Sequence, residues 1–130
     1  MQADAPARVI IESLRAGDAI RFRARGASMW PAVRGGALVE VTPCAAADLR
    51  AGELGAFERD GAVVVHRVVA HTPTSIRFTG DAVSGSDGDI DHARILGRAR
   101  VLEQRRLRLR IPSRRHLRTL ARALGRRLGW

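Results

Sequence analysis

Ser28 and His66 are the residues of this 130-residue chain whose types and settings could together do chemistry. Ser28 follows the turn residue Gly26, and His66 lies 38 positions later (66 − 28) inside an apolar run of valines. A serine hydroxyl is barely ionised at neutral pH, so a nucleophilic serine needs a neighbouring base to take its proton. The sequence therefore raises the hypothesis of a nucleophile and a base supplied by two separate elements.

The basic composition limits what that base can be. The chain contains no lysine, so all 23 of its basic residues are arginine. Arginine stays protonated and cannot act as a general base at ordinary pH. A Ser–Lys dyad is therefore excluded, and one of the four histidines must serve. His66 is the best placed, because burial in a valine-rich strand favours the neutral imidazole that a base requires; the structural alternative is a buried histidine bonded to a carbonyl group.

A carboxylate would complete such a pair by accepting the second ring N–H of His66 and steadying the imidazolium. Asp81 and Asp87 lie in an acidic loop that follows a predicted strand. Their alternative interpretation is turn formation, since aspartate beside glycine often bonds to its own backbone. Both remain candidates for orienting His66, and Asp81 is favoured for its fixed place directly after the strand.

Five short motifs, in order, resemble those of the signal peptidase family of serine endopeptidases, whose fold is shared with the self-cleaving repressors of the bacterial DNA-damage response. The resemblance is greatest to the archaeal and endoplasmic-reticulum branch, which uses Ser–His where bacterial signal peptidases use Ser–Lys. It covers the chain from about Ala19 to Val101. The motifs are Gly26 to Pro31, Leu49 to Leu54, His66 to Val68, Thr79 to Asp81 with Asp87 behind it, and Ile95 to Ala99.

This resemblance implies a serine endopeptidase that processes a peptide or protein precursor through an acyl-enzyme. The implied catalytic set is Ser28 as nucleophile, His66 as base, and Asp81 or Asp87 as the orienting acid. The Ser28 backbone N–H would supply half of an oxyanion hole, with a second donor that the sequence does not identify. No cofactor is implied.

Two neighbours of Ser28 are candidates for substrate binding. By the same resemblance, Met29 and Pro31 would flank the nucleophile and line an apolar pocket for small substrate side chains. The alternative for Met29 is that its flexible thioether fills a gap in the core.

The elements that must position these residues are mostly short strands. Alternating apolar and polar residues predict strands, Asp60-Gly61 predicts a hairpin turn, and Gly17 predicts the end of a helix. The expected fold is mainly β: a coiled antiparallel sheet or partly closed barrel of the signal peptidase–repressor type, with a short N-terminal helix. The predicted helix covers residues 7–15, the strands cover 19–24, 37–41, 53–58, 62–70, 75–78, 94–102 and 105–111, and a loop covers 79–92.

The domain prediction assigns residues 1–111 to one catalytic domain and residues 112–130 to a basic amphipathic helix. Its apolar stripe comprises Leu117, Leu120, Ala121, Leu124 and Leu128, and Arg114, Arg115, Arg118, Arg122 and Arg126 lie on the opposite arc. Such a helix could lie on anionic lipid, with Trp130 at the interface, or dock on the sheet through its leucines. The sequence leaves both alternatives open.

Net charge and composition limit the classes of partner that the chain could bind. The net charge of +10 suits an anionic surface, but aromatic residues for stacking on bases make up only 4% of the chain, so nucleic acid is disfavoured. No run approaches the roughly 20 apolar residues that a membrane-spanning helix needs, and the N-terminus lacks the layout of a secretory signal. We therefore expect a cytoplasmic protein, peripheral at a membrane if the C-terminal helix binds lipid.

Two further chemistries are not expected. The histidines and the single Cys44 lack metal-ligand spacing, so no metal site is predicted. A lone cysteine cannot form an internal disulfide, which fits a reducing compartment. The alternative to catalysis is a peptidase-fold binding or regulatory module that acts through its arginine-rich surface.

Overall fold

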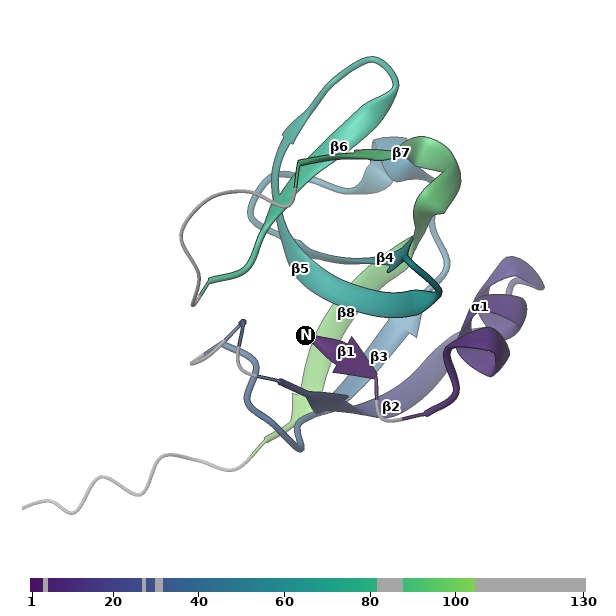
Figure 1. Cartoon of the computed structure of the whole chain (residues 1–130), viewed down its shortest axis with the longest axis vertical. Helices are drawn as coiled ribbons and strands as arrows, with labels where there is room; N and C mark the ends of the chain where they lie inside the picture. The colour runs from purple at the N-terminus through teal and green to yellow at the C-terminus, as the bar shows by residue number, and fades with distance from the viewer. Residues whose placement is uncertain (4, 27, 30–31, 82–87, 105–130) are drawn as a thin grey trace, which may run out of the picture.

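The computed structural model of this chain describes residues 1–3, 5–26, 28–29, 32–81 and 88–104 (Figure 1). Its strands form one antiparallel sheet, with a single α-helix and two short 3-10 turns beside it. The strands are β1 (Gln2–Ala3), β2 (Ile20–Arg25), β3 (Leu38–Thr42), β4 (Leu54–Arg59), β5 (Ala62–His71), β6 (Ser75–Thr79), β7 (Asp89–Asp91) and β8 (Ile95–Glu103). The helix α1 spans Ala7–Arg15, and the 3-10 turns span Ala46–Asp48 and His92–Arg94.

The sheet closes on itself through its shortest strand. Gln2 of β1 is the register partner both of Arg25 in β2 and of Val64 in β5. Strands β1, β2, β3, β8, β4 and β5 therefore form a closed six-stranded barrel, and β6 and β7 extend the sheet beyond β5. The prediction of a mainly β, coiled antiparallel fold with a short N-terminal helix is confirmed.

The alternating strands bury the side chains that their pattern predicts. In β2, Phe22 and Ala24 face the core while the intervening arginines are exposed. The β4–β5 hairpin turns at Asp60 and Gly61, whose φ angles of 51° and 77° are both positive, as a tight two-residue hairpin turn requires. Helix α1 ends as predicted before Gly17, which has a φ of 92°.

Two strands were not predicted. Strand β1 is two residues long, and β7 lies inside the stretch assigned to a loop over residues 79–92, so that assignment is wrong for residues 89–91. The sequence Asp89-Ile90-Asp91 holds one apolar residue, too few to show a period. Ile90 is nevertheless buried and pairs with Ile76 of β6.

Two apolar clusters lie on either side of the central strands. The first combines the inner side chains of the barrel with Ile10 and Leu14 of α1. The second contains Phe57 and Phe78 and lies where β6 and β7 continue the sheet. Because successive side chains of a strand point to opposite faces, β5 contributes to both clusters, with Val65 in the first and Val64 in the second.

The barrel depends on one close backbone contact between β8 and β3. A Cβ atom added at Gly97 would lie 2.2 Å from the Thr42 carbonyl oxygen, so only glycine fits there. The strand predicted over residues 105–111 and the helix predicted over residues 112–130 lie outside the described residues.

Candidate active site

The fold brings Ser28 and His66 together. Ser28 lies in the turn after β2, just beyond Gly26, whose φ of 96° turns the chain out of the strand. His66 lies in the middle of β5. The Ser28 Oγ and His66 Nε2 atoms are 2.9 Å apart, which is hydrogen-bond distance. This is the contact that a serine nucleophile needs with its base.

Packing holds the His66 ring in this position. The side chain is buried, with 4% of its surface exposed, and the ring of Phe57 meets it edge to face at 6.1 Å between centroids. The register partner of His66 on β4 is Gly55, where an added Cβ atom would lie 2.8 Å from the Phe78 ring. The imidazole is therefore buried beside the Phe57 ring, and the Gly55 position opposite it has no room for a larger side chain.

A third group contacts both members of the pair, and it was not predicted from the sequence. The Met1 amino group donates a hydrogen bond to Ser28 Oγ at 2.6 Å and lies 3.1 Å from His66 Nε2. Its position is fixed by the backbone, since the Val65 N–H donates to the Met1 carbonyl at 2.8 Å. No signal in residues 1–3 could have revealed this contact, because it exists only once β1 closes the barrel.

Asp81 is anchored on Arg67, the residue after His66. Arg67 donates from Nε to one carboxylate oxygen at 2.8 Å and from Nη2 to the other at 2.6 Å. These hydrogen bonds hold the pKa of Asp81 below its ordinary value; partial burial acts against them, and the charges of Arg67 and His66 lower the pKa further. Asp81 is thus ionised and within electrostatic range of His66. Asp87, the other candidate, lies outside the described residues.

The structure places Met29 in the barrel core. Its side chain is fully buried in the first cluster, and its sulfur accepts the Asp81 N–H at 3.3 Å. This contact joins the Ser28 turn to the segment that carries Asp81. A surface pocket of about 440 Å³ beside Ser28 is lined by Met1, Gln2, Arg25, Gly26 and Ser28, so Met29 is not part of its wall. Pro31 lies outside the described residues.

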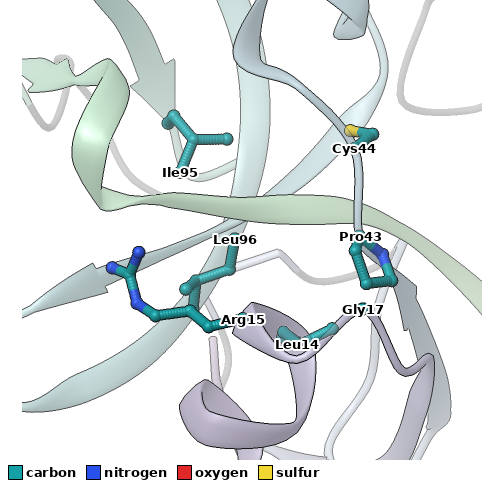
Figure 2. Close-up of a pocket in the computed structure, with 7 residues that line it drawn as sticks. All are labelled: Leu14, Arg15, Gly17, Pro43, Cys44, Ile95 and Leu96. Carbon is teal, nitrogen blue, oxygen red and sulfur yellow. The ribbon is translucent and has the colours of Figure 1, made fainter.

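Among the described residues, His71 and Cys44 lie apart from this pair. The His71 ring contacts the Leu49 carbonyl oxygen. Cys44 lines a second pocket, of about 450 Å³, between the end of α1 and β8 (Figure 2). Burial raises the pKa of its thiol and so disfavours the thiolate that nucleophilic chemistry requires. Within the described part of the chain, no three His, Cys, Asp or Glu side chains gather as metal ligands would.

No protein-family model, no curated protein and no solved structure matches this chain. Among the described residues, none of the helices has the length and apolar character that crossing a membrane would demand.

Proposed function

We propose that this chain is a serine endopeptidase of the signal peptidase–repressor type, which cleaves a peptide or protein precursor by a Ser–His mechanism. The observation that supports this proposal is the 2.9 Å contact between Ser28 Oγ and His66 Nε2. The two residues come from separate elements 38 positions apart, and the chain offers no lysine as an alternative base.

The contact supports a two-step acyl transfer. In the first step, Ser28 Oγ attacks the scissile carbonyl carbon while His66 Nε2 takes the hydroxyl proton. The C–N bond then breaks, the imidazolium returns that proton to the leaving amine, and an ester joins the acyl group to Oγ. In the second step, water attacks the ester with His66 again as base. The C–O bond to Ser28 breaks, the serine regains its proton, and the carboxyl product leaves.

Asp81 acts in this proposal as an electrostatic support. Its ionised carboxylate favours the imidazolium that forms in each step, and Arg67 keeps it ionised and in place. Arg67 is in turn fixed by a third hydrogen bond, from Nη1 to the Gly52 carbonyl at 2.7 Å. Arg67 is therefore a positioning residue. The Ser28 backbone N–H serves as one oxyanion donor.

A fluorophosphonate probe tests the nucleophile directly, since it reacts covalently with an activated serine and needs no knowledge of the substrate. The full chain should be labelled at Ser28, as located by mass spectrometry of the digested protein, and should cleave members of a peptide library. Ser28→Ala should lose both activities and keep its far-ultraviolet circular dichroism spectrum. The matched control is Ser13→Ala, which changes a serine of α1 outside the Ser28 turn and should retain both activities.

Labelling and cleavage that persist in Ser28→Ala would contradict the proposal. So would a full chain that is folded yet inert both to the probe and to the library.

A further inference from the structure

The strand β1 begins between the two members of the proposed dyad. Figure 1 shows the N-terminus and β1 lying between β2 and β5. The Met1 nitrogen is 2.6 Å from Ser28 Oγ and 3.1 Å from His66 Nε2, and the chain then runs away from both as an extended strand. A peptide segment thus starts at the reacting atoms and continues along a groove made by two strands.

The position of the Met1 amino group matches that of a product group in the proposed reaction. When a peptide bond is cleaved, the fragment that leaves first begins with a new amino group. That nitrogen has just received its proton from the histidine and has just separated from the carbon now bound to the serine. It must therefore lie within reach of both Nε2 and Oγ. The Met1 nitrogen meets both conditions.

The backbone contacts of β1 are those by which a peptide ligand adds to a sheet. The Val65 N–H of β5 donates to the Met1 carbonyl at 2.8 Å, and the β1–β2 ladder continues with Ala3 opposite Ala24. Side chains alternate along the segment: Met1 and Ala3 are buried, at 5% and 7% exposed, whereas Gln2 is exposed.

We propose that Met1–Ala3 occupies the leaving-group side of the peptide-binding site, so that a substrate must displace β1 to bind there. This inference rests on the proposed peptidase function. It also names the ligand: an extended peptide whose first residue after the scissile bond is apolar and whose third is small, with a tolerant position between them. In the undisplaced state, the Met1 amino group lies beside the Nε2 that must accept the serine proton.

Displacement of β1 would expose the buried Met1 and Ala3 side chains but leave the other strands paired. The strand has two residues, and the five other strands of the barrel remain paired in sequence from β2 to β5 through β3, β8 and β4. Short segments with few contacts open at the lowest free-energy cost in a folded protein.

The test compares two variants that add the same charge to the same strand. Ala3→Asp places a carboxylate at a buried position, which should expel β1 because a buried unpaired charge is strongly disfavoured. Gln2→Glu places it at the exposed neighbouring position and should leave β1 bound. Circular dichroism and thermal melts establish that the other strands stay folded in both variants.

The first readout follows β1 itself and does not depend on catalysis. Residues 1–130 contain no lysine, so in a 130-residue protein prepared with Met1 as its first residue, acetylation by an N-hydroxysuccinimide ester reports on the Met1 amino group alone. Loss of one or more backbone hydrogen bonds should make acetylation about tenfold faster in Ala3→Asp than in the full unmodified chain. Gln2→Glu should react at the unmodified rate.

The second readout follows Ser28, through the rate of fluorophosphonate labelling and the rate of peptide cleavage. Both rates should rise about tenfold in Ala3→Asp and stay unchanged in Gln2→Glu. Equal acetylation rates in all three chains would overturn the inference, because β1 would not shield the amine. Faster acetylation without faster labelling would also overturn it while leaving the peptidase intact. If Ser28 reacts in none of the chains, the proposed function itself fails and this inference fails with it.

Discussion

Ser28 and the Met1 amino group both lie against the same ring nitrogen of His66. A neutral imidazole has a single acceptor nitrogen, and both groups lie within hydrogen-bond distance of Nε2, at 2.9 and 3.1 Å. The proton on the ring therefore decides the state of the dyad, since an imidazolium can accept from neither group. This makes His66 the residue at which pH should act on the reaction.

Replacing His66 tests this dependence. His66→Gln should slow peptide cleavage by about 100-fold to 10,000-fold, because it removes the general base. In the unmodified chain, the rate should rise with pH as the ring loses its proton. The matched control is His71→Gln, whose ring bonds to the Leu49 carbonyl and does not contact Ser28. If His71→Gln is inactive and His66→Gln keeps its cleavage rate, the assignment of His66 as the general base is wrong.

The ion pair between Arg67 and Asp81 makes a contribution to the free energy of unfolding that depends on pH. The folded-state pKa of Asp81 is lowered, chiefly by Arg67, so the pair stabilises the fold above the unfolded pKa of aspartate and loses this effect as pH falls through the folded value. Arg67→Gln should lower the free energy of unfolding at pH 7 by about 0.5–1 kcal/mol, the range for a partly exposed pair.

Urea titrations of both chains at neutral and strongly acidic pH measure this difference. The gap should narrow at acidic pH without closing fully, because Arg67 also donates to the Gly52 carbonyl. A gap that widens in acid would contradict the role given to Asp81.

The sequence indicated which residues form the candidate site, but it did not indicate which side chain Asp81 contacts. Ser28 and His66 were identified from the motifs around them, and the absence of lysine left histidine as the type of base. The Arg67–Asp81 contact depends on the register of β5 against β6, in which Arg67 lies opposite Thr79 and so close to Asp81. Register is set by the packed fold, and no pattern in either segment specifies it.

At the scale of elements, the alternating strands that lie within the described residues were predicted to within one residue at each end. β1 and β7 were missed because two or three residues cannot display a period, and their pairing comes from neighbours far along the chain. Ile90 is buried only because Ile76 of β6 lies opposite it. The pairing that closes the barrel was thus less predictable than the individual strands that form it.

Gly97 provides a test of the β3–β8 contact. Gly97→Ala should destabilise the protein by about 1–3 kcal/mol, because the new methyl group would meet the Thr42 carbonyl and force the two backbones apart. The control Gly35→Ala should change stability by less than about 0.5 kcal/mol, since its nearest contact would be an ordinary 3.8 Å. Thermal melts of the two variants measure the difference; similar melting temperatures would show that β8 can shift at no cost.

At the scale of the whole molecule, the net charge of +10 is the dominant property. Six arginines fall in residues 112–130: Arg114, Arg115, Arg118, Arg122, Arg126 and Arg127. Each arginine near an anionic membrane surface contributes about 1 kcal/mol to binding. We therefore expect the chain to sediment with anionic vesicles, less so as salt rises, and not with zwitterionic ones.

Replacing those six arginines by glutamine should abolish the sedimentation. The control replaces Arg21, Arg23 and Arg25, which are exposed on β2, and should weaken it only in part. Binding that survives the first set of changes would assign the effect to the barrel instead of the C-terminal residues.

The position of β1 also bears on how the molecule behaves when that strand is absent. A strand without a neighbour presents a row of free N–H and C=O groups, which is a template for pairing with another chain. Losing β1 would expose two such edges, one on β2 and one on β5, which differ in charge. The β2 edge carries exposed arginines that repel a second copy, whereas the β5 edge beside Val63, Val64 and Val65 has no charge to do so. Ala3→Asp should therefore self-associate along β5 as its concentration rises in analytical ultracentrifugation, and an extended peptide that fills the groove should reverse it.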